Sequence, residues 1–260
     1  MTQAATETET ETCIEFKDVL AGYGDFMILN QLSFKAQRGK ITLLLGPNGA
    51  GKSTVLKTLF SMLKVRQGSI WLDGKEITGA APKELLVRHG IAYVPQGRNL
   101  FGQLTAYENL ELGGITLGMN TTRARIPAVL ERFPQIKQRL NRAAASLSGG
   151  EQKQLEVGRA LLLQPKVLLI DEPSIGLSPL VVADVFKLLR ELADQGTTVL
   201  MVEQNVKSAL KVADEAIALE SGRLVLQKPA DELLNDPHIE RLFLGGVHSM
   251  ATASTSTDSD

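Results

Sequence analysis

The stretch ITLLLGPNGAGKST, residues 41–54, decides the fold. Its first five residues are apolar and β-prone, and the rest satisfies the pattern G-x-x-x-x-G-K-[ST]. Gly46, Gly49 and Gly51 let backbone N–H groups turn inward around phosphate oxygens, because glycine has no Cβ to clash. A helix that begins near Gly51 directs the positive end of its dipole at the same anion. The stretch therefore predicts a strand, a phosphate-binding loop and a helix.

The polar side chains of this loop have separate predicted roles. Lys52 supplies a compact positive charge for the β- and γ-phosphates of a nucleotide, and Ser53 supplies a hydroxyl group for Mg²⁺. The alternative is a glycine-rich turn with a chance lysine, which the strand before and the helix after disfavour. The residues expected to bind the nucleotide are Gly46, Pro47, Asn48, Gly49, Ala50, Gly51, Lys52, Ser53 and Thr54.

The composition narrows the class of protein. The 260 residues are 43% hydrophobic and 22% charged, which is typical of a soluble globular protein with a sizeable core. The net charge of −1 shows no basic excess, so we expect no nucleic-acid partner. Cys13 is the only cysteine, which excludes a disulfide framework and a cysteine metal cluster.

The chain carries no sign of a membrane span or a secretion signal. No apolar run approaches the roughly 20 residues that cross a bilayer. The N-terminus MTQAATETETET lacks the basic and apolar start of a signal peptide. We therefore expect a cytoplasmic location.

Organisation along the chain indicates one folded domain, residues 13–246, between disordered polar tails at 1–12 and 247–260. Near-continuous apolar runs, typical of strands covered on both faces, occupy 40–46, 91–95, 166–171 and 197–203. Helical patterns follow at about 51–63, 180–194 and 205–212. This alternation predicts an α/β fold with a mainly parallel sheet. A small antiparallel layer is predicted from the segments CIEFKDVLAG, QLSFKAQ and SIWLDG. A helical subdomain is predicted for residues of about 103–160.

The run KVLLIDEP, residues 166–173, ends a predicted strand in two carboxylates. Side chains alternate along a strand, so Asp171 and Glu172 point in different directions and can take different roles. We expect Asp171 to hold Mg²⁺ through its water shell. We expect Glu172 to polarise an attacking water, a role worth about 10²–10⁴ in rate. The alternative is an acidic turn after a strand.

A second candidate anion site lies in LSGGEQ, residues 147–152, at the start of a helical pattern. Ser148 followed by Gly149 and Gly150 at a helix N-terminus suits an anion. A single ATP does not need two phosphate-binding elements, unless each element serves a different ATP in a dimer.

These motifs together resemble the ATP-binding cassette (ABC) ATPases, the P-loop NTPases of ABC transporters, over nearly the whole folded region. GPNGAGKS is similar to their Walker A loop, LLIDEP to the Walker B strand and LSGGEQ to the signature. Gln96 in YVPQG is similar to the Q-loop glutamine, and Tyr23 in AGYGDF to the aromatic residue that stacks on adenine. The resemblance implies that two cassettes enclose two ATP molecules, with Ser148 and Gly150 contacting the γ-phosphate of the partner's ATP.

Two of these assignments have local alternatives. Tyr23 could be only a strand-end aromatic residue, and Gln96 could only cap the turn after its strand. The resemblance favours adenine stacking for Tyr23. For Gln96 it favours contact with the metal and the water, and coupling of the site to the helical insert.

The segment VEQN, residues 202–205, departs from the general ABC pattern, because Gln204 stands where a switch histidine normally reaches the γ-phosphate. Its amide can donate a hydrogen bond to a phosphate oxygen but cannot gain a positive charge. A loss of roughly 1 kcal/mol at the transition state slows hydrolysis about fivefold, so we expect a weakened site and not a dead one. The alternative is a solvated strand-end residue. Ser178 also departs, because many cassettes have an aspartate there.

The combination of YVPQGRNLFGQLTAYENL, LSGGEQ, DEPSIGLSP and VEQN is similar to one branch of the family, the LivF-type ATP-binding subunits of branched-chain amino acid importers. This resemblance implies an ATPase peripheral on the inner face of the membrane. It implies as partners a second, different cassette, two membrane permease subunits and, indirectly, a solute-binding protein. The alternatives are a related urea or amide importer, an exporter, a soluble ABC ATPase and a weakly hydrolysing regulatory module.

Overall fold

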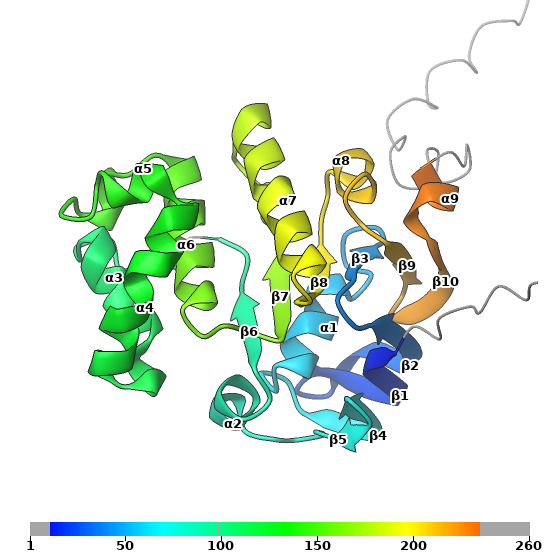
Figure 1. Cartoon of the computed structure of the whole chain (residues 1–260). Coiled ribbons are helices and arrows are strands. Elements are labelled where there is room, and N and C mark those ends of the chain that lie inside the picture. The colour runs from blue at the N-terminus through cyan, green and yellow to red at the C-terminus, as the bar shows by residue number, and fades with distance from the viewer. Residues whose placement is uncertain (1–10, 98, 235–260) are drawn as a thin grey trace, which may run out of the picture.

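The computed structural model describes residues 11–97 and 99–234 (Figure 1). Nearly all of the predicted N-terminal tail, the whole predicted C-terminal tail and the end of the predicted domain at 235–246 lie outside the described residues. Within the described part, no helix is long and apolar enough to cross a bilayer.

A six-stranded sheet forms the centre of the molecule, in the order β10-β9-β3-β8-β7-β6. The pairs β3–β8, β3–β9, β7–β8 and β6–β7 are parallel, and among the described strands of this sheet only the edge hairpin β9–β10 is antiparallel. The strands span β3 Ile41–Leu45, β6 Ile91–Val94, β7 Val167–Asp171, β8 Thr198–Val202, β9 Glu215–Glu220 and β10 Arg223–Pro229. The prediction of an α/β fold with a mainly parallel sheet is confirmed, and the β9–β10 hairpin is an addition to it.

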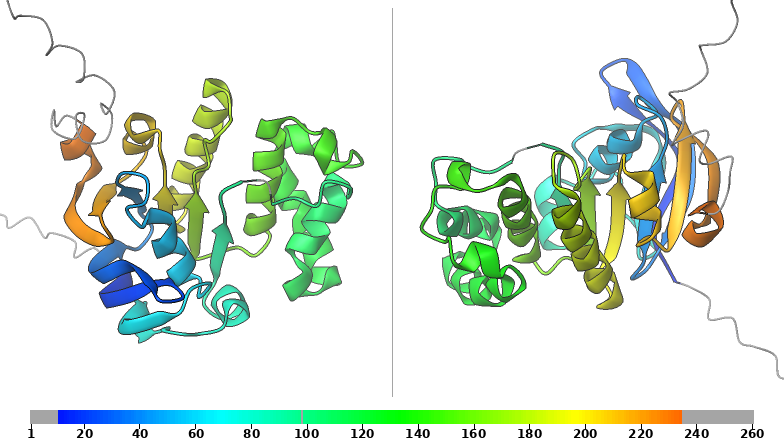
Figure 2. Two further views of the ribbon diagram at one scale, coloured as in Figure 1. Left: turned by 180° about the vertical axis from the view of Figure 1, so that it is seen from behind. Right: turned by 90° about the horizontal axis from the view of Figure 1, so that it is seen from above.

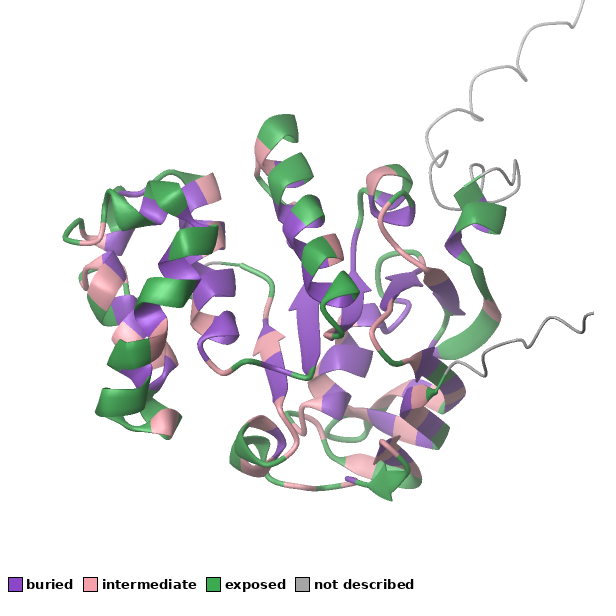
Figure 3. Cartoon of the chain, in the orientation of Figure 1, coloured by how far each residue is buried: buried purple, intermediate pink, exposed green. Residues whose placement is uncertain are grey.

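Strands β3, β7 and β8 of this sheet are buried on both faces, which explains the near-continuous apolar runs (Figure 3). In β7, Leu168 and Ile170 join one hydrophobic cluster, whereas Val167 and Leu169 join the other. Successive side chains alternate between the faces, so the four residues before Asp171 are all apolar. Strands β3, β6, β7 and β8 are each one or two residues shorter than the apolar runs that predicted them.

A second, antiparallel sheet covers one face, in the order β2-β1-β4-β5. Its strands are β1 Thr12–Tyr23, β2 Phe26–Gln37, β4 Val65–Leu72 and β5 Lys75–Glu76. The rings of Phe16 and Phe34 stack at 4.6 Å between the two longest strands. Helix α1 (Lys52–Leu59) contributes Val55 and Leu56 to the same cluster. The nearby α2 spans Pro82–Val87.

Helices cover the other face and extend to one side. Figures 1 and 2 show α3, α4, α5 and α6 gathered beside β6, at the side of the molecule away from β10. They span α3 Ala106–Gly113, α4 Met119–Arg132, α5 Pro134–Lys137 and α6 Gly149–Leu161, with 3₁₀ turns at Ile115–Leu117 and Ala144–Ser146. The remaining helices are α7 Pro179–Asp194, α8 Val206–Leu210 and α9 Ala230–Leu234. The chain enters the helical group after β6 and returns from it to β7, so the group is joined to the sheet by the segment that carries Gln96.

Candidate active site

Polar residues meet where four parallel strands end. Because β3, β6, β7 and β8 run in the same direction, the residues that follow them lie at one edge of the sheet. Gly46, Gln96, Glu172 and Gln204 all follow these strands. Since β8 lies between β3 and β7, Gln204 falls between the glycine-rich loop and the acidic pair.

The loop after β3 has the geometry of an anion cradle. The φ of Gly46 is +148°, and a methyl group there would overlap the carbonyl oxygen of Leu219, so only glycine fits. Helix α1 begins at Lys52, with Gly51 in the left-handed region as its N-cap. The Lys52 Nζ donates to the carbonyl oxygens of Gly46 and Pro47 at 2.8 and 2.9 Å. The backbone and the ammonium group therefore converge on one concave loop.

Burial lowers the pKa of Lys52, while Glu172 and Asp171 act in the opposite direction. A buried ammonium group close to two carboxylates interacts strongly with an added anion, because little water screens it. These features suit the phosphates of a nucleotide.

Asp171 is a buried carboxylate, 1% exposed, whose hydrogen bonds within the described residues come from hydroxyl groups. Ser53 Oγ donates to its Oδ1 at 3.0 Å, and the Tyr93 hydroxyl donates to its Oδ2 at 3.4 Å. Burial raises the pKa of Asp171; the hydrogen bond from Ser53 opposes this rise, and the charge of Glu172 adds to it. A cation would relieve the buried negative charge, and hydroxyl and carboxylate oxygens are ligands that Mg²⁺ accepts. Ser53 and Asp171 therefore fit a magnesium site completed by water and phosphate oxygens.

Glu172 is held between two glutamines. Gln96 Nε2 donates to its Oε2 at 2.6 Å, and Gln204 Nε2 donates to its Oε1 at 2.7 Å. The Glu172 backbone adopts φ +48°, so the chain turns sharply just after β7. The structure thus brings together three residues that the sequence placed in separate motifs. Gln96 and Gln204 were expected to contact metal and phosphate, and here both amides contact the glutamate.

Tyr23 contacts α1. Its hydroxyl accepts a hydrogen bond from Lys57 Nζ at 3.2 Å, and Lys57 follows Ser53 by one helical turn. The side chain is 46% exposed, so the ring is accessible for stacking.

Ser148, Gly149 and Gly150 form a separate cluster at the start of α6. Ser148 is the N-cap, and its hydroxyl accepts from Glu151 N while Glu151 accepts from Ser148 N. A methyl group on Gly150 would lie 2.8 Å from Val181 Cγ1, so α6 approaches the start of α7 closely. The neighbours of these glycines belong to the segment 176–181 and not to the loop at 46–54.

Sequence reasoning missed two residues of this edge, Tyr93 and Glu203. Glu203, taken as the last residue of a strand, lies just beyond β8 and accepts hydrogen bonds from two loops. The only signal was an acidic residue at the end of a fully apolar strand.

Comparison with known proteins identifies the family. The model of the ABC transporter family matches residues 29–175. The chain is 42% identical to the high-affinity branched-chain amino acid transport ATP-binding protein BraG of Pseudomonas aeruginosa, over 90% of this chain and all of BraG. It is 40% identical to the probable branched-chain amino acid transport ATP-binding protein LivF of Archaeoglobus fulgidus, over 87% of this chain and 96% of LivF. It is 32% identical to the lipopolysaccharide export system ATP-binding protein LptB of Escherichia coli, over 88% of this chain and 95% of LptB.

Solved structures agree with this assignment. An ATP-binding cassette of an ABC transporter in its ADP conformation superposes with a TM-score of 0.81 and 28% identity, covering 91% of this chain and 100% of that one. A dimeric cassette bound to ADP and phosphate after hydrolysis gives a TM-score of 0.73 and 26% identity, covering 84% and 98%. The chain therefore belongs to the ABC transporter family, as an ATP-binding subunit that hydrolyses ATP.

Proposed function

We propose that this chain is one of two ATPase subunits that drive an importer for branched-chain or other hydrophobic amino acids. The observation that carries this proposal is the 42% identity across the full length of BraG, against 32% to LptB. The match to BraG includes nearly the whole described part of the chain, so the resemblance extends beyond the nucleotide motifs.

Hydrolysis at the proposed site uses the cluster at the carboxyl edge of the sheet. The loop 46–54 and Lys52 hold the phosphates, and Tyr23 stacks on the base. Ser53, Asp171 and Gln96 would hold Mg²⁺, which would supply positive charge to neutralise the phosphate oxygens. Glu172 accepts a hydrogen bond from the attacking water and orients it. A carboxylate has about four acceptor positions, and the two glutamine amides occupy two, so Glu172 retains capacity for water.

A second cassette completes the site. Ser148 and Gly150 lie apart from the cradle, beside the start of α7. In the proposed dimer they contact an ATP bound by a partner, whose own signature covers the ATP of this chain. We propose that the partner is a different cassette with a histidine at the position of Gln204, which makes the two sites unequal.

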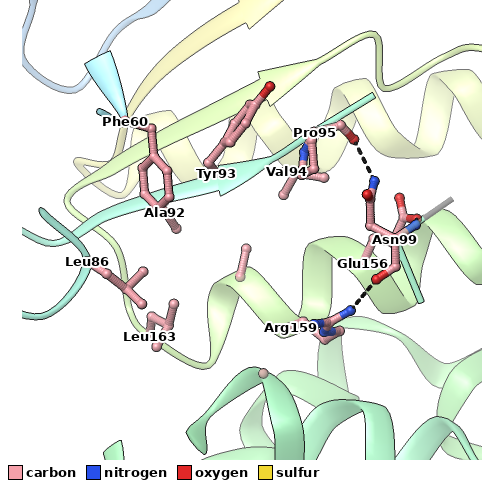
Figure 4. A pocket seen from close by; sticks show the side chains of 12 residues that line it. Phe60, Leu86, Ala92, Tyr93, Val94, Pro95, Asn99, Glu156, Arg159 and Leu163 are labelled. Carbon is pink, nitrogen blue, oxygen red and sulfur yellow. Dashed lines mark hydrogen bonds between the residues drawn. The ribbon is translucent and has the colours of Figure 1, made fainter. Parts of the chain in front are cut away.

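The permease subunits dock in a groove between β6 and α6 (Figure 4). The groove has a volume of about 300 Å³ and is lined on one side by apolar residues such as Phe60 and Leu86, and on the other by Asn99, Glu156 and Arg159. Glu156 accepts from Asn99 N at 2.8 Å, and Arg159 donates to Asn99 O at 2.6 Å. Asn99 Nδ2 donates to the carbonyl oxygen of Gln96 at 3.4 Å. The helical group is therefore fastened to the segment that carries Gln96, so a loop seated in this groove contacts both.

This docking places the chain on the inner face of the membrane, with the solute-binding protein on the far side. Neither that protein nor the solute contacts this chain in the proposed assembly.

Capture from native membranes tests the assembly. The chain would be tagged after residue 260, extracted in mild detergent and analysed by mass spectrometry with its companions. We expect a second, histidine-bearing cassette and two multi-span proteins. Recovery of the chain alone, with ribosomes or with DNA-bound proteins would overturn the transport role.

Uptake measurements test the solute. Cells lacking this chain would be given radiolabelled leucine or urea, and complemented with the wild type or with Glu172→Gln, which should assemble but not turn over. We expect only the wild type to restore leucine uptake, with urea uptake unaffected. Restoration of urea uptake alone would assign the related urea and amide branch.

A further inference from the structure

We propose that Glu203 is a positioning residue, which fixes the Gln204 amide against Glu172 by tying together the two loops that carry them. The inference deepens the proposed function, because it rests on the roles proposed there for Glu172 and Gln204.

The Glu203 carboxylate is 2% exposed and accepts four hydrogen bonds. Its Oε1 accepts from Ser174 N at 2.7 Å. Its Oε2 accepts from Ser174 Oγ at 2.8 Å, Gln204 N at 3.0 Å and Asn205 N at 3.2 Å. One side chain therefore binds both the loop after β8 and the turn after β7.

The chemistry of these donors requires a carboxylate. All four donors are neutral N–H or O–H groups, and an ionised carboxylate is the side chain that only accepts. A glutamine at this position has one amide oxygen and one NH₂ group. With the NH₂ group in place of Oε1, it would face the donor Ser174 N. With the NH₂ group in place of Oε2, it would face the three donors that now bind Oε2. It would therefore lose at least one hydrogen bond and set two donors against each other.

Short segments of the chain connect the residues that bind Glu203 to Glu172 and to the Gln204 amide. Gln204, whose backbone N–H binds Glu203, places its side-chain amide on Glu172 at 2.7 Å. Ser174 follows Glu172 by two residues, and Ile175 N donates to the Glu172 carbonyl oxygen at 3.3 Å to close the turn. Glu203 thus fixes the donor and the acceptor of the Gln204–Glu172 hydrogen bond from both sides. A displacement of about 1 Å in such a pair can change a rate by about 10²-fold.

Steady-state kinetics on the purified full-length chain, in its complex where the complex is recovered, test the inference. For Glu203→Gln we expect kcat to fall about tenfold to a hundredfold. We expect the KM for ATP to stay within about twofold, because the cradle and Tyr23 are not held by Glu203. For Ser174→Ala, which removes only the Oγ donor, we expect kcat to fall about two- to tenfold.

A double-mutant cycle separates positioning from general damage to the fold. If Glu203 acts through Gln204, Glu203→Gln should reduce kcat much less in a Gln204→Ala background than in the wild type. Should Glu203→Gln not fold, the same cycle is run with Ser174→Ala. The matched control is Asp214→Asn, which removes a carboxylate bound to Ile41 N, Lys40 and Arg190 at the opposite end of β3. It should leave kcat unchanged.

Two results would overturn the inference. One is a folded Glu203→Gln or Ser174→Ala variant with wild-type kcat. The other is an equal fold-loss in the wild-type and Gln204→Ala backgrounds. A failure of the proposed transport role would give a different result. The wild-type chain would then hydrolyse ATP, but its capture from membranes would not recover permease subunits.

Discussion

Asp171 and Glu203 are two buried carboxylates at the ends of neighbouring strands, yet their surroundings differ. Both are almost fully inaccessible, at 1% and 2% exposure. Asp171 accepts two hydrogen bonds, both from hydroxyl groups, whereas Glu203 accepts four, three of them from backbone N–H groups. A carboxylate has about four acceptor positions. Protein donors therefore occupy all the acceptor positions of Glu203, which suits a residue that holds loops together. Asp171 retains acceptor positions for a cation.

Glu172, one residue after Asp171, stands between these cases. It accepts two hydrogen bonds from amides and is 6% exposed. Its remaining acceptor positions leave room for a water molecule. These differences support the roles proposed for the three acids: metal ligand for Asp171, water-orienting base for Glu172 and positioning residue for Glu203.

The largest effect on activity is expected at Glu172. Glu172→Gln should reduce the rate of phosphate release by about 10²–10⁴, because an amide cannot accept the proton of water. ATP binding, measured by equilibrium titration, should be retained because the cradle is untouched. A rate close to that of the wild type would mean that another group orients the water.

Asp171→Asn should separate activity from stability. We expect Mg²⁺-dependent hydrolysis to fall roughly 10²-fold or more, since a bound metal contributes several kcal/mol. We expect the Tm of the nucleotide-free protein at pH 7 to stay level or rise, because the raised pKa of Asp171 shows that burial disfavours its charged form. The wild type loses stability as the pH rises through that pKa, and asparagine does not.

Thermal scans at pH 4 and pH 7 check this expectation. The gap between Asp171→Asn and the wild type should shrink at the lower pH, where less of the wild-type carboxyl is ionised at equilibrium. A lower Tm for the variant at pH 7 would place Asp171 with Glu203 as a structural acid.

The contrast between Asp171 and Glu203 also explains why the sequence predicted a role for Asp171 and none for Glu203. Asp171 and Glu172 belong to a local pattern, an apolar strand followed by two carboxylates, and local patterns are visible in the chain. The partner of Glu203 is Ser174, which lies 29 residues earlier, and no periodicity reports that contact. The β9–β10 hairpin was overlooked for a related reason: β10 is largely exposed, with a burial pattern that lacks clean alternation.

A smaller effect is expected at the glutamine that Glu203 holds. Gln204→His should keep the activity or raise it by up to about fivefold, because a protonated imidazole donates a charge-assisted hydrogen bond. The gain should grow as the pH falls toward about 6.5, where histidine gains its proton. The matched variant Gln204→Glu sets a like charge against Glu172 and should lower the rate. A large loss in Gln204→His would show that a neutral amide is required.

The smallest effect on activity is expected at a fourth acid, Asp214, which lies at the opposite end of the central sheet and is bound by cations. Burial raises its pKa, but hydrogen bonds from Arg190 and Ile41 N and the charge of Arg190 outweigh burial, so the pKa of Asp214 lies below its usual range. Asp214→Asn should lower the free energy of unfolding by about 1–3 kcal/mol without changing kcat. Because a depressed pKa stabilises the fold above the unfolded value, the difference from the wild type should be complete at neutral pH. It should disappear as the pH falls through the folded pKa.

Asp194→Asn is the matched control for Asp214, because Asp194 pairs with the same arginine at 2.9 Å while its side chain is mostly exposed. An exposed pair contributes about 0–1 kcal/mol, so urea unfolding should detect a smaller change for this variant. Equal losses for the two variants would show that burial does not decide the contribution of an acid here.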